Sequence, residues 1–73
     1  MKWMNYVAEV EYANREWHQQ PKPFIVRAVG LKHAIRIATL RHPDAQRHEV
    51  ELCRCHEINN DMCPAHYRFY AAQ

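Results

Sequence analysis

The stretch FIVRAVGLKHAIRIATLRHP, residues 24–43, contains the two patterns that decide the fold. Its first part alternates between inward and outward positions, which predicts a strand over residues 22–29. Its second part changes to helical spacing and predicts a helix over residues 31–42 that ends before a proline. The inward positions are Phe24, Val26 and Ala28 in the strand and Leu31, Ala34, Ile35 and Ala38 in the helix.

Three further stretches alternate in the same way and are predicted to be strands. They are MNYVAEVEY at residues 4–12, RHEVELCRC at residues 47–55 and AHYRFYA at residues 65–71. The predicted fold class is therefore α+β with the element order β-β-α-β-β. Its four-stranded antiparallel sheet has the order 2-1-3-4, and the one helix packs on one face.

Cross-strand pairs set the predicted register of this sheet. Val10 lies opposite Val26 in the first pair of strands, and Val50 lies opposite Phe69 in the last hairpin. The second face of the sheet is then mixed in character, so a homodimer through it is one alternative. The charged pairs that support these registers are Glu9 with Arg27 and Glu51 with Arg68.

The composition indicates one small globular domain, residues 1–73. Apolar residues make up 48% of the chain, which favours a packed core over disorder, and a net charge of +2 does not by itself indicate a nucleic-acid partner. The N-terminus lacks the apolar run of a signal peptide and no stretch is long enough to span a membrane, so we expect a cytoplasmic protein without membrane contact. No catalytic signature is present, and we expect no enzymatic activity.

All three cysteines lie in CRCHEINNDMCPAH, residues 53–66. In the predicted hairpin three thiols and one imidazole converge, because residues across a strand pair and residues two apart share a face. Structural zinc accepts such a Cys3His set. The candidate metal ligands are Cys53, Cys55, Cys63 and His66.

Two other interpretations of the cysteines stay open. A C-x-C followed by a C-x-x-H lacks the paired two-residue knuckles of zinc motifs, and an extended strand spreads the two sulfurs of a C-x-C apart. The spacing therefore favours a protein without a cofactor, in which the cysteines are small hydrophobic residues and zinc is the alternative. A disulfide between Cys55 and Cys63 is the third interpretation.

Two surfaces are candidates for partner binding. The outward side of the predicted helix combines an apolar residue with cations, and the loop of residues 13–23 carries a tryptophan and an arginine, the residue types that dominate interfaces. In the opposing interpretation Leu40 is covered by Trp3 or by this loop, and Trp17 folds back onto the core. The candidates are Lys32, His33, Arg36, Leu40 and Arg41 on the helix, with Arg15 and Trp17 in the loop.

The stretch of residues 24–43 resembles the strand-helix core of very small proteins from bacteriophages and mobile elements. In those proteins a V-x-A strand precedes an amphipathic helix with paired alanines, and some anti-CRISPR proteins and other phage inhibitors of host defence look like this. The resemblance implies no cofactor and inhibition by masking a surface of a larger host protein or nucleoprotein complex in the host cytoplasm. The cysteine-rich hairpin and the lack of Asp or Ser before the helix depart from that group.

We therefore expect a small non-enzymatic binding protein of the phage-inhibitor type. The alternative is a small nucleic-acid-binding module in which zinc stabilises the C-terminal hairpin. Steep loss of binding with added salt distinguishes the second from the first. In the alternative, the phosphate contacts come from Lys32, Arg36, Arg41 and Arg47.

Overall fold

The computed structural model describes residues 2–55 and 63–73. Within them the chain forms a three-stranded antiparallel sheet and two α-helices, so the predicted α+β class is confirmed. No helix in these residues is long and apolar enough to cross a membrane. The elements in chain order are β1 (Met4–Glu11), the short 3-10 helix η1 (Trp17–Gln19), β2 (Phe24–Ala28), α1 (Leu31–Arg41), β3 (Arg47–Leu52) and α2 (Pro64–Ala71).

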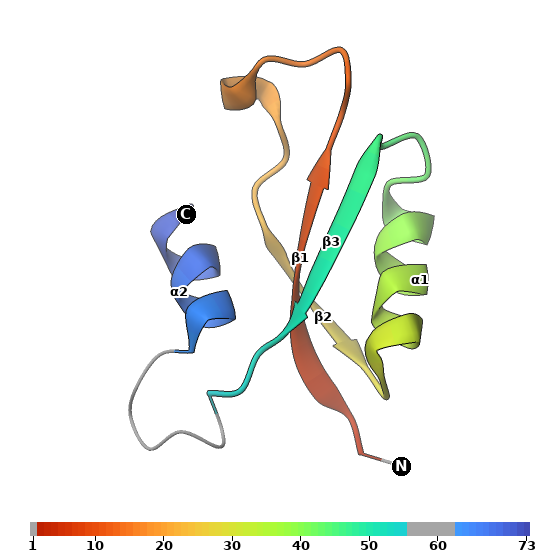
Figure 1. The fold of residues 1–73 in the computed structure, drawn as a ribbon, viewed down its shortest axis with the longest axis vertical. Coiled ribbons are helices and arrows are strands. Elements are labelled where there is room, and N and C mark those ends of the chain that lie inside the picture. Colours follow the sequence, from red (N-terminus) through yellow and green to blue (C-terminus); the bar gives the residue numbers. More distant parts are fainter. Residues whose placement is uncertain (1, 56–62) are drawn as a thin grey trace.

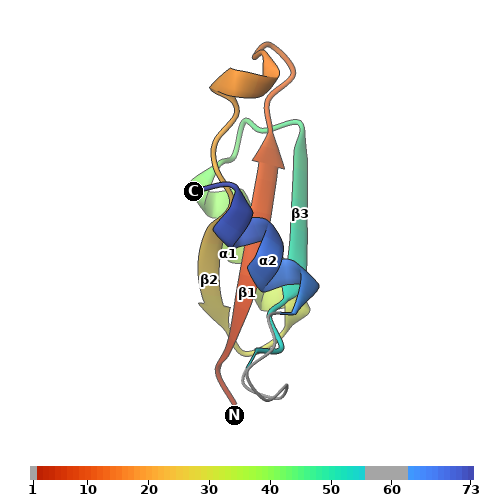
Figure 2. The same ribbon diagram turned by 90° about the vertical axis from the view of Figure 1, so that its left-hand side faces the viewer.

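The sheet is a middle layer between the two helices. Its strand order is β2-β1-β3, and α1 and α2 lie on opposite faces (Figure 1). Seen from the α2 side, this helix crosses in front of β1 (Figure 2). The four-strand prediction left the second face of the sheet open, whereas in the structure α2 covers it.

The predicted fourth strand is wrong, because residues 64–71 are helical. Pro64 occupies the first turn of α2, where its fixed φ favours a helix and its missing N–H costs nothing. Ala65 and Phe69, one turn apart, both face the sheet. The sheet order 2-1-3-4, the single helix and the pairing of Val50 with Phe69 are therefore wrong as well.

The predicted register of the first two strands is also wrong. Tyr6, not Val10, lies opposite Val26, and Asn5 lies opposite Arg27. The two registers differ by four residues, an even number, so both bury the same side of each strand. The connection between β1 and β2 is too long to fix the register, and the alternation pattern cannot distinguish the two.

Two small cores result, one on each face of the sheet. Tyr6 and Ala8 point toward α1, whereas Val7 points toward α2, so β1 is buried on both sides. The core beneath α1 is built largely from small residues, which let the helix approach the sheet closely. Its buried members are Tyr6, Ala8, Val26, Ala28, Ala34 and Ala38.

The helix predicted over residues 31–42 is confirmed, but its buried side differs from the prediction. Ala34 and Ala38 are fully buried, as expected, and Ile37 packs against the same core. Leu31 and Ile35 were predicted to be inward, yet they are 51% and 39% exposed. The helix approaches the sheet most closely at the two alanines, so the contact between helix and sheet is centred on them. Leu31 and Ile35 lie to one side of the alanines and therefore at the edge of this contact.

The start of α1 is stabilised by His33 and not by a capping Ser or Asp. Its Nδ1 accepts a hydrogen bond of 3.1 Å from the backbone N–H of Val29, just before the N-cap residue Gly30. This bond pairs the N–H of Val29, between β2 and the N-cap, and so holds the chain where it enters the helix. The role of His33 as a predicted partner-binding residue is not tested by this contact.

The close contact of α1 with the sheet is testable at Ala38. We expect Ala38→Leu to lower the free energy of unfolding by about 1–3 kcal/mol, because the added side chain has no room and pushes the helix away. Urea unfolding followed by circular dichroism measures the loss. The control is Thr39→Ala at the exposed neighbouring position, for which we expect a change below about 0.5 kcal/mol. Equal losses in both variants would contradict the packing assignment.

Candidate metal centre

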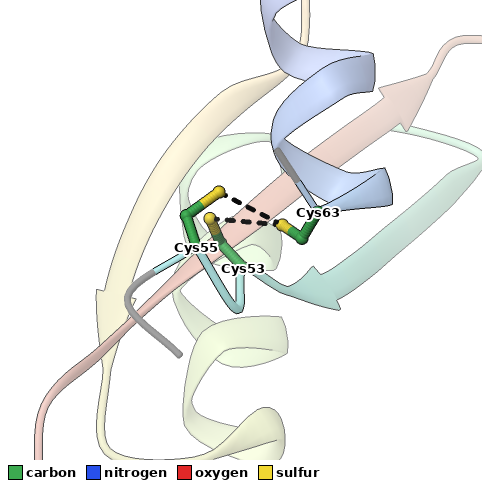
Figure 3. A group of neighbouring side chains, drawn as sticks. All are labelled: Cys53, Cys55 and Cys63. Carbon is green, nitrogen blue, oxygen red and sulfur yellow. Dashed lines mark hydrogen bonds between the residues drawn. The ribbon is translucent and has the colours of Figure 1, made fainter. Parts of the chain in front are cut away.

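The three cysteines converge where the end of β3 meets the start of α2. Their sulfur atoms all lie within 4.8 Å of one another (Figure 3). The Sγ atom of Cys63 is 3.5 Å from that of Cys55 and 3.6 Å from that of Cys53. All three are free thiols, so the alternative disulfide between Cys55 and Cys63 is not formed in this structure.

Cys53 reaches the group from the position directly after β3, whose last paired residue is Leu52. Its backbone N–H donates to the carbonyl of Asn5 in β1 at 2.9 Å, and its side chain packs with Val7 on the α2 face. After Cys53 the chain leaves the sheet, so Cys55 is not in an extended strand. The sequence argument against a C-x-C ligand pair assumed a strand through both cysteines, and it fails for this reason.

Cys63 is the N-cap residue of α2 and the centre of the group. It is 1% exposed, and its Sγ accepts hydrogen bonds of 3.3 Å from the backbone N–H groups of Arg54 and His66. The sulfur thus takes the place of the Ser or Asp oxygen that usually caps a helix. The signal in the sequence is Pro64 directly after Cys63, the residue pair typical of a helix start, which the strand prediction overlooked.

The surroundings shift the pKa values of two of the thiols in opposite directions. Burial raises the pKa of Cys53 to about 11. Burial alone would also raise the pKa of Cys63, but the two backbone N–H donors and the neighbouring thiols lower it to about 7. Negative charge at this site is therefore concentrated on Cys63, the sulfur at the positive end of the helix dipole.

His66 is the fourth predicted ligand and touches the group through Cys55. Its Nδ1 lies 2.7 Å from the Sγ of Cys55. His66 follows Cys63 by three residues, so the two side chains extend from the same end of α2. The structure thus gathers the three predicted cysteines at a helix start in place of the expected hairpin turn, and the His66 imidazole contacts one of them, Cys55.

The sulfur spacing is close to that of a tetrahedral metal site. Zn–S bonds of about 2.3 Å place neighbouring sulfurs about 3.8 Å apart in a tetrahedron. The distances of 3.5 and 3.6 Å from Cys63 to the other two sulfurs come near this value. Thiolate and imidazole are the ligands of structural zinc, so the chemistry of this donor set fits that ion.

Arg68 adds an electrostatic contact that holds α2 on the sheet. Its guanidinium pairs with Glu51 of β3 and lies 3.9 Å from Glu9 of β1. The predicted pair of Glu51 with Arg68 therefore forms, although Arg68 comes from a helix. Two neighbouring carboxylates on one sheet face repel each other, and one guanidinium between them offsets this repulsion.

The candidate partner residues on α1 differ in their surroundings. Leu40 is 74% exposed, so neither Trp3 nor the loop of residues 13–23 covers it. Arg41 leans over the ring of Phe24, with its Cζ 4.8 Å from the ring centre. Lys32 and Arg36 are exposed on the outward side.

The candidate partner residues between β1 and β2 lie in a loop that Gln20 holds together. The side-chain amide of Gln20 donates to the carbonyl groups of Tyr12 and Arg15 and accepts from the N–H of Tyr12. Trp17 is 85% exposed, so the prediction that it folds back onto the core is wrong. Arg15 stacks on Tyr12, with its Cζ 4.0 Å from the ring centre.

The contribution of Arg68 to the position of α2 is testable by its salt dependence. We expect Arg68→Ala to lower the free energy of unfolding by up to about 1 kcal/mol at low salt, because its ion pairs are partly exposed. At about 1 M salt, where charges are screened within about 3 Å, we expect most of this difference to vanish. Arg54→Ala is the matched control, since its side chain forms no ion pair in the described residues. A loss that salt does not reduce would contradict this contribution.

The described residues thus offer one group of metal-type ligands at the start of α2 and one exposed cationic helix, α1. A function is inferred from these two features. No family model, no curated protein and no solved structure matches the chain.

Proposed function

We propose that the protein is a small non-enzymatic binding module in which one zinc ion fastens α2 to the sheet. Cys53, Cys55, Cys63 and His66 hold the ion. The observation that supports this most directly is the convergence of three sulfurs within 4.8 Å around a helix-capping cysteine, with an imidazole nitrogen beside one of them. Zinc needs no redox partner and tolerates this tetrahedral set of ligands.

The size of α2 gives the metal a structural role. The helix has eight residues, fewer than an isolated helix needs to be stable in water. Its apolar contacts are few: Ala65 is buried and Phe69 is partly buried against Val7. Metal–ligand bonds would supply the stabilisation that this small core lacks, as structural zinc does in other small domains.

The polar groups around β3 support a non-enzymatic role. Glu49 and Glu51 point to the α2 face of this strand, where Arg47 and Arg68 pair with them. His48 points to the other face, and its Nε2 lies 2.7 Å from the carbonyl oxygen of His42. The carboxylates are engaged by arginines and the imidazole by a backbone carbonyl, and among the described residues no hydrogen bond joins them as an acid–base pair.

The binding role falls to the outward side of α1. The metal centre lies on the opposite face of the sheet, so α1 is free to contact a partner while α2 and the metal complete the fold. The more specific role of a phage-type inhibitor of host defence stays a prediction.

The four proposed ligands make a direct test of the metal. We expect protein purified without a chelator to carry one zinc per chain in native mass spectrometry. Replacing any of the three cysteines by serine, or His66 by alanine, should weaken zinc binding by at least about 100-fold. This loss exceeds the roughly 10–100-fold that is typical when a residue that only supports a ligand is replaced. His18→Ala in the exposed loop is the control and should retain the ion. A bare, fully reduced protein after zinc addition would refute the site.

Chelation tests the structural role separately. When zinc is removed, we expect hydrogen exchange to become fast for the N–H of Tyr67, which donates to the Cys63 carbonyl within α2. The N–H of Ala34, which donates to the Gly30 carbonyl at the start of α1, should keep its protection because its core lies on the other face. Loss of protection at both sites together would mean that the metal supports the whole fold and not α2 alone.

A further inference from the structure

The charges of the chain are divided between its two faces. The segment of residues 17–43, which contains β2 and α1, holds five Lys and Arg and no Asp or Glu. All eight carboxylates lie outside this segment, together with the other five cations. The net charge of the chain is therefore small although its charges are distributed very unevenly along the sequence.

The fold carries part of this division into space, because the cations of α1 lie on one face of the sheet, whereas Arg27 of β2 lies beside Asn5 on the α2 face. Glu9, Glu11, Glu49 and Glu51 point to the α2 face of the sheet, on the same side as Val7. Arg47 bridges Glu11 and Glu49, and Arg68 bridges Glu9 and Glu51. Every ion pair in residues 2–55 and 63–73 uses one of these two arginines. The cations of α1, on the other face, therefore have no carboxylate partner among those residues.

Two of these cations form the centre of the outward surface of α1. Lys32 and Arg36 are one helical turn apart, so their side chains extend from neighbouring points of the same side. Both are exposed, and the buried positions Ala34 and Ala38 lie on the opposite side of the helix. Protein interfaces tend to exclude charge from their centre, whereas phosphate binding requires it there.

An aromatic ring lies at the N-terminal end of this surface. Trp3 is 53% exposed and contacts His33 edge-on, with the ring centres 5.7 Å apart. His33 is itself held by its hydrogen bond from the N–H of Val29. The indole is therefore anchored by one ring contact and remains about half exposed, which leaves aromatic surface on which a base could stack.

We infer that this surface binds single-stranded nucleic acid. The inference rests on the proposed binding role of α1 and specifies its partner. Lys32 and Arg36 contact phosphates, and Trp3 stacks on an unpaired base. Cations beside an exposed aromatic ring are the usual means of binding single strands without sequence readout. Arg47, a predicted phosphate contact, is excluded because it is tied to Glu11 and Glu49 on the far side.

The test is fluorescence anisotropy of zinc-loaded protein with a labelled oligothymidylate of about 15 nucleotides, alongside a duplex of equal length. We expect the affinity to fall between about 50 and 200 mM salt, and the salt slope to fall by about 0.7 for each phosphate contact removed. Arg36→Ala, alone or with Lys32→Ala, should weaken binding, by about tenfold in the double variant. Both positions are exposed and helical, so alanine should not disturb the fold.

Trp3 separates stacking from charge. Trp3→Ala should weaken single-strand binding by about 5-fold to 150-fold and leave duplex binding nearly unchanged, whereas Trp3→Phe should retain most of the affinity. Arg47→Ala is the matched control for Arg36→Ala, because it removes the same charge from the opposite face. Equal losses in those two variants would mean that only net charge matters and would overturn the inference.

The remaining outcomes distinguish this inference from the proposed function. Zinc-loaded protein that does not bind the oligonucleotide, or that binds the single strand equally well with and without the Trp3 side chain, would overturn the inference and leave the zinc site intact. Salt-insensitive binding of a purified acidic protein through α1, with no binding of the oligonucleotide, would overturn it in favour of a protein partner. Oligonucleotide binding by a protein that never takes up zinc would support the inference and refute the metal site.

Discussion

The burial of β1 on both faces is the constraint on which the rest of the structure depends. Tyr6, Val7 and Ala8 are consecutive and all buried, so each side of the strand needs a covering element. On one side α1 meets this need through Ala34 and Ala38, which bring its backbone close to the sheet. On the other side the covering element among residues 2–55 and 63–73 is the short helix α2, whose apolar surface is small. The convergence of polarisable thiols on that side therefore compensates for a core that hydrophobic burial alone leaves weak.

The charge arrangement follows from the same layering. Two glutamates of β1 point away from the α1-facing core, and their neighbours on β3 include two more. These carboxylates need countercharges within reach, which Arg47 and Arg68 supply. The arginines used there already have carboxylate partners, whereas those of α1 have none among the described residues. The positions of the cations on the two faces thus distinguish those that form ion pairs from those that remain available for binding. The number of cations in the sequence does not make this distinction.

The sequence predicts an element correctly where its pattern is long and is compatible with only one type of secondary structure. The strand and helix in residues 24–43 are correct because the change from alternation to helical spacing spans twenty residues. In residues 65–71, by contrast, alternating aromatics suggest a strand while Ala65 and Phe69, four apart, suit a helix equally well. The deciding feature is the cap formed by Cys63 and Pro64. The three cysteines nevertheless come together as expected, and their role as metal ligands stays a prediction.

The metal centre and the surface of α1 share one structural link, the first residues of β1. The N–H of Cys53 donates to the carbonyl of Asn5, two residues after Trp3. This bond therefore fixes the end of β3 to the start of β1, directly after Trp3. The side chain of the neighbouring Met4 packs toward α1, so the same strand end contacts both β3 and the α1 core. A metal bound at Cys53, as proposed, would thus also restrict the position of Trp3, although the cysteines lie on the opposite face from Lys32 and Arg36.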